Sequence, residues 1–182
     1  MHIALFFGSF NPVHLGHLSI AQHVLNECGI DEVHFVLSPH NPFKSTDDLW
    51  DVEKRWELLN QSIASNPQFK ASDIELQLPT PNYTTLTLKH LESLQTGHTY
   101  SILMGSDSFA SIQQWQSPEH LLSYPILVYP RIDSSFSTDY PNVTLLDSPL
   151  FGISATDIRR MLKEGQSVRY LVRDEILNLL EK

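Results

Sequence analysis

The strongest constraint on the fold lies at the N-terminus, where a strand pattern is followed directly by a helix pattern. Residues 3–7 form a continuous apolar run that ends at Gly8, which is typical of a strand buried on both faces of a parallel sheet. Apolar residues then recur at helical spacing over 15–28, and Gly29 gives a helix stop. A second strand is predicted at 33–37. Strand, helix and strand within about 35 residues predict a βαβ unit.

The alternation of strand and helix patterns continues to the end of the chain. Helical spacing recurs at residues 52–63, 86–94, 154–163 and 171–180. Strand-like runs lie at 71–76, 100–104, 126–129 and 143–146. We therefore expect a single domain over residues 1–182 with a Rossmann-like α/β fold: an open, mostly parallel sheet with helices on both faces and a C-terminal helical segment. Ligands of such sheets bind beyond the carboxyl ends of the strands.

The composition restricts the kinds of partner that the chain can bind. Its 12 Lys and Arg against 21 Asp and Glu give a net charge of -9, and the sequence shows no basic face that would bind nucleic acid. The predicted ligand is therefore a small anion. Cys28 is the only cysteine, which fits a reducing compartment, and the N-terminal apolar run is too short for a signal peptide or a membrane span. We expect a cytoplasmic protein without nucleic-acid or membrane partners, and a homo-oligomer is compatible with this composition.

A candidate phosphate site lies at the predicted start of the first helix. His14 and His17 are three residues apart, a spacing that puts both imidazoles on one helix face. Gly16 removes a side chain between them, and the helix start offers unpaired N–H groups and the positive end of the helix dipole. This combination predicts a phosphate cradle with two imidazole donors. The same spacing also fits a metal pair or two surface histidines, and the residues alone leave these alternatives open.

A second candidate site opens a helix near the C-terminus. Ser154 is suited to cap this helix, with Asp157 three residues later in a variant of the capping box. The segment also places two hydroxyls, on Ser154 and Thr156, before Arg159. Hydroxyls, helix N–H groups and a guanidinium suit the β- and γ-phosphates of a nucleotide. Capping and phosphate binding are compatible.

Both segments match motifs of one known superfamily. Residues 8–17, Gly-Ser-Phe-Asn-Pro-Val-His-Leu-Gly-His, resemble the (T/H)xGH-type motif of the nucleotidylyltransferases, and 153–159, Ile-Ser-Ala-Thr-Asp-Ile-Arg, resemble their ISSTxxR motif. Within this superfamily the chain is most similar to the bacterial nicotinate-nucleotide adenylyltransferase family, over nearly its whole length. The middle of the chain adds further similar stretches at 38–44, 55–59, 79–88 and 104–109.

The resemblance implies an enzyme that moves AMP from ATP to nicotinate mononucleotide, giving deamido-NAD and pyrophosphate in NAD biosynthesis. It implies that the catalytic residues are His14, His17, Lys44 and Arg159. It implies that ATP is bound by Gly8, Ser9, Phe10, Gly16, Gly105, Asp107, Ser154 and Thr156. It implies that the mononucleotide is bound by Asn11, Tyr83, Thr84, Trp115 and Arg131. Mg²⁺ would accompany ATP, held by its phosphates and water rather than by a protein metal site.

The chain departs from the family motifs at several positions. Ser9 and Asn11 stand where Thr and Asp are commoner, Ala155 replaces a Ser, and Arg131 follows Pro130 where Arg-Pro-Gly is common. Asn11 keeps the shape of an aspartate and loses its charge. The departures at Asn11 and Ala155 leave open a non-catalytic nucleotide sensor of the same fold. Two further alternatives stay open: a pantetheine-phosphate adenylyltransferase, which Gly8-Ser9-Phe10 also suits, and a metal hydrolase built on the two histidines.

Overall fold

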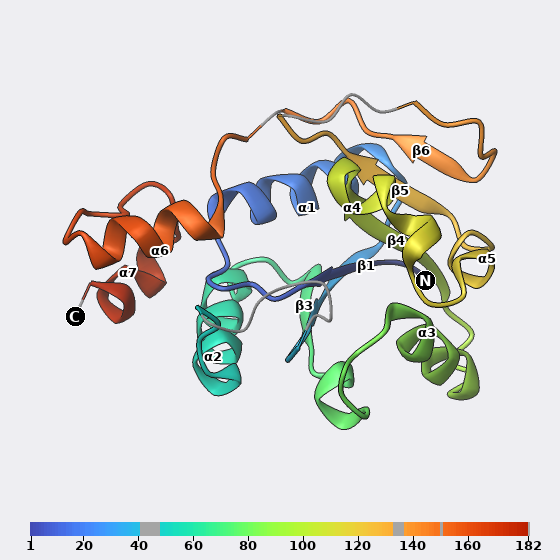
Figure 1. The fold of residues 1–182 in the computed structure, drawn as a ribbon, viewed down its shortest axis with the longest axis horizontal. Helices are drawn as coiled ribbons and strands as arrows, with labels where there is room; N and C mark the ends of the chain where they lie inside the picture. Colours follow the sequence, from blue (N-terminus) through green and yellow to red (C-terminus); the bar gives the residue numbers. More distant parts are fainter. Residues whose placement is uncertain (41–47, 133–136, 150, 182) are drawn as a thin grey trace.

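One parallel sheet organises the chain. The computed structural model describes residues 1–40, 48–132, 137–149 and 151–181. The sheet in these residues has six strands in the order β3-β2-β1-β4-β5-β6, all paired in parallel (Figure 1). The strands are β1 (His2–Gly8), β2 (Glu32–Leu37), β3 (Phe69–Ser72), β4 (Thr99–Gly105), β5 (Ile126–Tyr129) and β6 (Val143–Leu145). This arrangement confirms the predicted Rossmann-like α/β fold, with β1 and β4 at the reversal of strand order.

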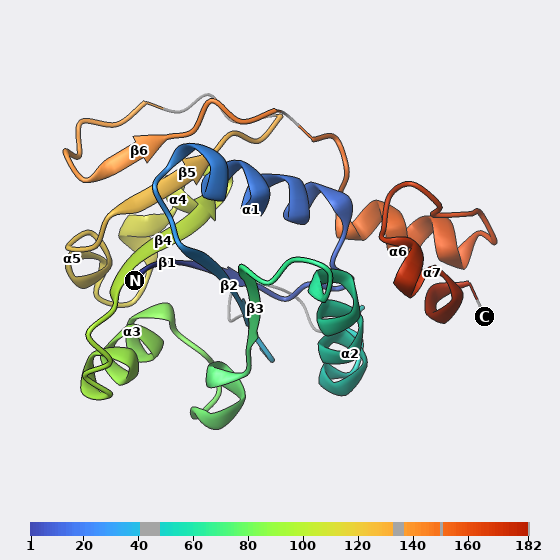
Figure 2. The same cartoon turned by 180° about the vertical axis from the view of Figure 1, so that it is seen from behind.

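Helices pack on both faces of the sheet (Figure 2). The helices on one face are α1 (Leu15–Glu27), α2 (Val52–Ile63), α6 (Ala155–Lys163) and α7 (Asp174–Leu180). Those on the other face are α3 (Thr84–Ser93), α4 (Ser106–Ala110) and α5 (Pro118–Leu121). The chain also forms two short 3₁₀ helices, η1 (Ile74–Gln77) and η2 (Ile112–Gln114). Within the described parts of the chain, no helix combines the length and apolar character needed to cross a membrane.

Residues 3–7 of β1 are all apolar because the side chains of this strand alternate between two buried clusters. Ala4 and Phe6 point into the cluster that contains α1, whereas Ile3 and Leu5 point into the cluster that contains α3. Burying one such large side chain contributes about 1.5–3 kcal/mol to stability. Burial on both sides therefore explains the uninterrupted apolar run near the N-terminus.

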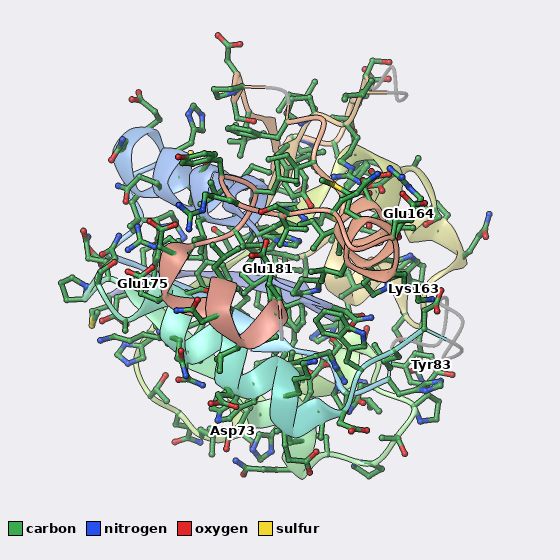
Figure 3. All side chains as sticks on the ribbon, turned by 90° about the vertical axis from the view of Figure 1, so that its left-hand side faces the viewer. Asp73, Tyr83, Lys163, Glu164, Glu175 and Glu181 are labelled. Atoms are coloured by element: carbon green, nitrogen blue, oxygen red, sulfur yellow. The ribbon has the colours of Figure 1, made fainter. Side chains whose placement is uncertain are left out.

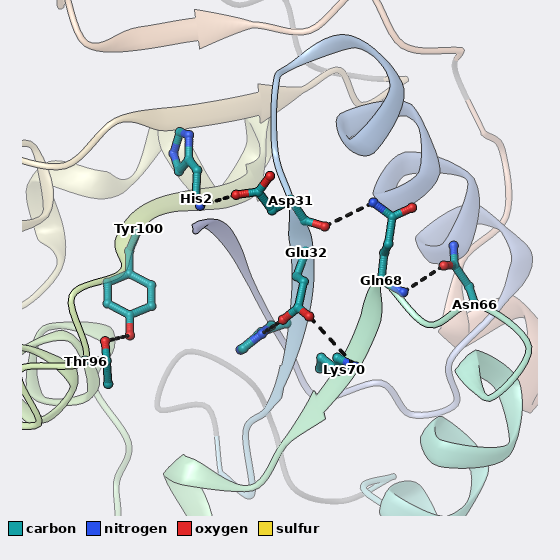
Figure 4. A network of polar contacts seen from close by, with 9 residues as sticks. His2, Asp31, Glu32, Asn66, Gln68, Lys70, Thr96 and Tyr100 are labelled. Atoms are coloured by element: carbon teal, nitrogen blue, oxygen red, sulfur yellow. Dashed lines mark hydrogen bonds and ion pairs between the residues drawn. The ribbon is translucent and has the colours of Figure 1, made fainter.

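Polar contacts tie together the amino ends of three strands (Figure 4). The His2 N–H donates to the Asp31 carboxylate at 2.7 Å, and the Gln68 side chain donates to the Asp31 C=O at 3.1 Å. Lys70 lies 3.8 Å from Glu32 across β2 and β3. These contacts fix the edge of the sheet that lies away from the strands' carboxyl ends, where the fold places ligands.

The structure corrects two of the predicted elements. The strand expected at 71–76 ends at Ser72 and is followed by η1, because the Glu75 side chain turns inward and is 2% exposed. The sequence pattern predicts no helix over 106–121, yet α4, η2 and α5 form there. Each of these helices is five residues or shorter, too short to display a helical period.

Candidate active site

A cavity of about 800 Å³ opens at the carboxyl ends of β1 and β4, which is where ligands of this fold bind. Its walls come from the β1–α1 segment, the start of α3, the ends of β4 and β5, and the start of α6. Every predicted site residue that the structure describes lines this cavity, except Gly16. Lys44 lies outside the described residues. The structure therefore brings the predicted positions together, while the role of each one stays a prediction.

The segment between β1 and α1 is shaped by a close approach at Gly8. A Cβ on Gly8 would lie 2.9 Å from the Phe10 ring, so a larger residue would push that ring away. Phe10 has a φ of 42°, in the left-handed region that few side chains adopt. Its ring is buried and meets the His17 ring edge to face, with 5.2 Å between centroids. Phe10 therefore forms part of the cavity wall and also supports His17.

His14 and His17 lie side by side at the start of α1. Their rings stack with centroids 3.7 Å apart, and the His14 N–H donates to Nδ1 of His17 at 3.3 Å. Because Nδ1 of His17 accepts this hydrogen bond, Nε2 is the ring nitrogen that carries a proton and can donate. A Cβ on Gly16 would lie 3.0 Å from the His14 ring, so glycine makes room for the stacked pair.

Burial sets the charge of His14. The residue is 5% exposed, and burial, with a smaller contribution from Arg131, lowers the pKa of His14 from 6.5 to about 4. His14 is therefore neutral near pH 7 and can contribute a hydrogen bond rather than a positive charge. Its Nδ1 is buried without a hydrogen-bond partner among the described residues.

The first turn of α1 has fewer unpaired N–H groups than the sequence predicts. The Leu15 N–H donates to the Leu171 C=O at 2.9 Å, and the His17 N–H donates to the His14 C=O at 3.0 Å. The prediction of unpaired N–H groups is therefore wrong at these two positions. The segment before α7 supplies the partner of the Leu15 N–H, and the first turn itself supplies that of the His17 N–H. Gly16 lies between them, and its N–H stays a candidate for binding a phosphate.

Asn11 joins the first motif to the chain that enters α2. Its Nδ2 donates to the Asp48 C=O at 2.9 Å, and its Oδ1 accepts from the Trp50 N–H at 3.1 Å. A carboxylate could not donate the first of these bonds, which explains why an amide suits this position. Asn11 also lines the cavity, so its contact with the mononucleotide stays a prediction.

A buried arginine holds the segments that follow β1 and β2. Arg55 on α2 is 1% exposed and donates to the C=O groups of Ser9, Ser38, Pro39 and Trp50 at 2.8–3.1 Å. Burial lowers the pKa of its guanidinium. Because its donors point at backbone carbonyls, Arg55 has a structural role.

The start of α6 docks onto the first motif. Ser154 caps the helix by accepting from the Asp157 N–H at 3.0 Å, as predicted. Arg159 donates to the Asn11 C=O at 2.8 Å and lies 3.4 Å from the Thr156 hydroxyl. Its Nε is buried without a partner among the described residues. The two motifs therefore meet directly, although Asn11 and Arg159 are 148 positions apart in the sequence.

The ends of β4 and β5 contribute a charged pair to the cavity. Nε of Arg131 lies 3.7 Å from Oδ2 of Asp107, and the Arg131 N–H donates to the Ser106 hydroxyl at 3.0 Å. A Cβ on Gly105 would lie 2.4 Å from Oδ1 of Asp107, so glycine lets the carboxylate fold back over the strand end. Exposed ion pairs contribute little to stability, so the main consequence is the orientation of both side chains at the cavity.

The cavity wall contains a buried carboxylate that no sequence motif indicates. Glu75 is 2% exposed and accepts hydrogen bonds from the Ser38 hydroxyl at 2.6 Å and the Thr87 hydroxyl at 2.9 Å. Burial raises the pKa of Glu75, and the two hydroxyl bonds partly offset that rise. The available signal was Thr87, a polar residue on the apolar face of a predicted helix. The sequence contains no motif that pairs it with Glu75.

The two imidazoles beside the start of α1 can donate hydrogen bonds to one phosphate, while the Arg159 guanidinium with two hydroxyls can hold another. Both sets face one cavity, whose volume suits a nucleotide. Transfer of a phosphoryl-type group requires mainly such positioning and charge stabilisation from the protein. The fold and the site therefore define a protein of the nucleotidyltransferase class.

Comparisons with known proteins narrow this class. The cytidylyltransferase-like family model matches residues 5–161. A Cytophaga hutchinsonii protein named "Probable nicotinate-nucleotide adenylyltransferase" is 43% identical, over 99% of this chain and 95% of that protein. A Bacteroides fragilis protein of the same name is 41% identical, over 94% of this chain and 87% of that protein. The chain therefore belongs to the cytidylyltransferase-like family, and within it to the nicotinate-nucleotide adenylyltransferases.

A solved structure shows the same fold. It is described as Plasmodium falciparum nicotinic acid mononucleotide adenylyltransferase complexed with NaAD, and it matches with a TM-score of 0.81 at 19% identity. The match covers 98% of this chain and 95% of that one. The fold therefore extends over nearly the whole of both chains.

Proposed function

We propose that this chain transfers AMP from ATP to nicotinate mononucleotide, forming deamido-NAD and pyrophosphate in NAD biosynthesis. The observation that supports this proposal most is the hydrogen bond from Arg159 to the Asn11 C=O, which holds both motifs together at one cavity. In the reaction, a phosphate oxygen of the mononucleotide bonds to the α-phosphorus of ATP. The bond from that phosphorus to the departing pyrophosphate breaks on the opposite side.

The start of α1 is the proposed place of reaction. Under this proposal His17 donates from Nε2 to the transferring phosphate, and His14 adds a hydrogen bond from its neutral ring. Donors fixed before the reaction stabilise the charge that develops in the transition state without having to reorganise. The stacked rings and the support from Phe10 provide that rigidity. Gly8, Ser9 and Gly16 allow the triphosphate to approach the backbone.

The start of α6 is the proposed grip on the leaving pyrophosphate. Ser154 and Thr156 would bind it through their hydroxyls and Arg159 through its guanidinium. The unpartnered Nε of Arg159 supports this assignment, since a phosphate could satisfy it. Gly105 and Asp107 would border the adenosine. Lys44 would neutralise charge on the transferring group, and this role also stays a proposal.

The wall formed by the start of α3 and the residues around Trp115 is the proposed mononucleotide site. Tyr83 and Thr84 line the cavity there. Trp115 donates from its indole to the Ser111 hydroxyl at 3.2 Å, which helps to fix the plane of a ring that could stack on a pyridine. Arg131 would meet the mononucleotide phosphate.

A divalent metal accompanies ATP in nucleotidyltransferases of this kind, and we propose that it is Mg²⁺. Each acidic side chain on the described cavity wall already has a partner: Asp48 pairs with Lys163 at 2.7 Å, Asp107 pairs with Arg131, and Glu75 accepts from two hydroxyls. Lys163 lies at the end of α6 (Figure 3). The described residues contain no group of three or more His, Cys, Asp or Glu that could hold an ion. ATP phosphates and water would therefore hold the Mg²⁺, which would offset the charge of the triphosphate.

Three further expectations accompany this function. A cytoplasmic location fits an enzyme that uses ATP and a soluble mononucleotide. The absence of nucleic-acid and membrane partners stays a prediction from the acidic composition. Homo-oligomerisation also stays a prediction.

Pyrophosphate release in the presence of ATP tests the proposed function. Nicotinate mononucleotide, nicotinamide mononucleotide and phosphopantetheine are supplied in parallel, and we expect the highest rate with nicotinate mononucleotide. Release with phosphopantetheine but not with nicotinate mononucleotide would replace the proposal with the pantetheine enzyme. ATP binding without turnover would indicate a sensor. Zinc bound stoichiometrically after purification would indicate a metal hydrolase.

A further inference from the structure

Glu75 connects the end of β2 to the start of α3. Its carboxylate accepts from the Ser38 hydroxyl at 2.6 Å and the Thr87 hydroxyl at 2.9 Å, and its C=O accepts from the Asn82 side chain at 2.8 Å. All four residues are at most 7% exposed. We call these three hydrogen bonds the Glu75 bracket. The bracket is buried and joins segments that are separate in the sequence.

Stability alone is a poor explanation for a carboxylate at this position. A buried ionised group loses its hydration, and an apolar side chain of similar volume often serves stability as well or better. The two hydroxyls direct both carboxylate oxygens, and the nearby start of α3 favours a negative charge. Glu75 also lines the cavity rather than the interior of a cluster.

The Glu75 bracket continues to both sides of the proposed mononucleotide site. The Ser38 N–H donates to the Gly8 C=O at 2.9 Å, which links the bracket to the first motif. At the other end, the Thr85 hydroxyl donates to the Gln116 C=O at 2.6 Å, which links α3 to the residue that follows Trp115. The cavity-lining residues at 83–84 are therefore held between two fixed points.

We propose that Glu75 is a positioning residue for the mononucleotide, because its bracket sets the start of α3 against the first motif and the Trp115 segment. This inference rests on the proposed function. The start of α6 is attached separately, through the bond from Arg159 to the Asn11 C=O. Loosening the Glu75 bracket should therefore weaken mononucleotide binding far more than ATP binding.

Two substitutions separate this role from a general effect on folding. Glu75→Gln keeps the shape, removes the charge and replaces one acceptor oxygen with an NH₂ group, so one of the two hydroxyls must accept a hydrogen bond instead of donating it. We expect its KM for nicotinate mononucleotide to rise about tenfold, as loss of a buried hydrogen bond to a charged group implies, with the KM for ATP within about twofold of wild type. Thr87→Val removes one donor from a position outside the cavity lining, and we expect a smaller rise of the same selectivity.

Glu92→Gln is the matched control. Glu92 lies on α3, the helix that contains Thr87, and its carboxylate accepts from Tyr124 and His120. It is exposed and does not line the cavity. We expect wild-type KM values for this variant. Hydrogen–deuterium exchange of residues 79–90 gives a second readout that does not require activity. We expect faster exchange there in Glu75→Gln than in Glu92→Gln.

The outcomes distinguish this inference from the proposed function. If wild type forms deamido-NAD while Glu75→Gln keeps its KM for nicotinate mononucleotide, or raises both KM values equally, the positioning role is wrong and the function stands. If Glu75→Gln does not fold, an unchanged KM for the mononucleotide in Thr87→Val has the same meaning. If wild type makes no deamido-NAD, the proposed function fails. Equal hydrogen–deuterium exchange of residues 79–90 in Glu75→Gln and Glu92→Gln would overturn the positioning role, whether or not the enzyme is active.

Discussion

The starts of α1 and α6 face the same cavity and contain the two sequence motifs, but they are built differently. At α1, His14 is 5% exposed and stacks on His17, which the buried Phe10 supports. At α6, Thr156 is exposed and Ser154 is half-buried, and Arg159 reaches back to the first motif. One helix start is fixed by packing, and the other is attached through side-chain and backbone hydrogen bonds.

This difference suggests separate tasks for the two helix starts. Groups that act in the transition state gain most from being fixed in advance, which suits the buried pair on α1. Groups that bind a flexible triphosphate can be more exposed, since ground-state binding tolerates adjustment. We therefore expect substitutions at α1 to lower kcat and substitutions at α6 to raise the KM for ATP.

The largest expected effect is that of His17→Ala. Removing one fixed donor from a charge-stabilising site lowers kcat by about 10²- to 10³-fold, and ATP binding measured by calorimetry should stay close to wild type. His23→Ala on the same helix is the control, since His23 does not line the cavity. A large loss of ATP affinity in His17→Ala, with kcat unchanged, would reverse the division of tasks.

The second expected effect is the acid sensitivity conferred by His14. Because burial holds the pKa of folded His14 at about 4, below the unfolded value of 6.5, the unfolded chain binds this proton first as the pH falls. The contribution of His14 to the free energy of unfolding is therefore constant above pH 6.5 and falls between pH 6.5 and about 4, by up to about 3 kcal/mol.

Urea unfolding of wild type and His14→Gln at several pH values measures this contribution. The variant should show a flatter decline of the free energy of unfolding between pH 6.5 and about 4. Parallel curves for the two proteins would mean that His14 is less buried in solution than in the structure, and would contradict the view that the start of α1 is fixed by packing.

A smaller effect is expected for Arg159→Ala at α6. Losing charge-assisted hydrogen bonds to phosphate should raise the KM for ATP by about 10- to 100-fold, with a smaller change in kcat at saturating ATP. Arg160→Ala is the control, because the Arg160 side chain is 55% exposed and pairs with Glu164 and Asp157. If Arg159→Ala lowers kcat as much as His17→Ala does, both helix starts act in the transition state.

The smallest effect is expected for Ser154→Ala. The variant loses the bond that the Asp157 N–H donates to the cap, which corresponds to about 1 kcal/mol of stability. The midpoint of urea unfolding should fall accordingly, and the KM for ATP should rise less than in Arg159→Ala. A rise in KM without any loss of stability would show that the hydroxyl acts on phosphate alone.

Local sequence patterns were enough to predict much of the fold. The apolar run before Gly8 and the helical period after residue 15 predict β1 and α1, and the two motifs predict which positions meet the cavity. These features are local because burial on both faces and helix spacing leave direct marks on composition. Short elements such as α4, η2 and α5 leave no such mark.

Contacts between distant residues could not be predicted in this way. The bond from Arg159 to the Asn11 C=O, the cover of Leu171 over the start of α1, and the Glu75 bracket all join separate segments. Each of them includes a backbone carbonyl as acceptor, and every residue possesses such a carbonyl, so no sequence pattern marks it. Asn11 shows the consequence: the motif comparison presents it as a lost charge, whereas the structure gives its amide two backbone partners.

The most direct test of the central claim is the stereochemical course at the α-phosphorus. One diastereomer of ATP with sulfur in place of an α-phosphate oxygen is reacted with nicotinate mononucleotide, and the configuration of the thio-deamido-NAD product is determined. We predict inversion, because the mononucleotide phosphate displaces pyrophosphate in one in-line step at the start of α1. Retention would contradict this account, since it would mean that a side chain such as His17 first accepts AMP covalently.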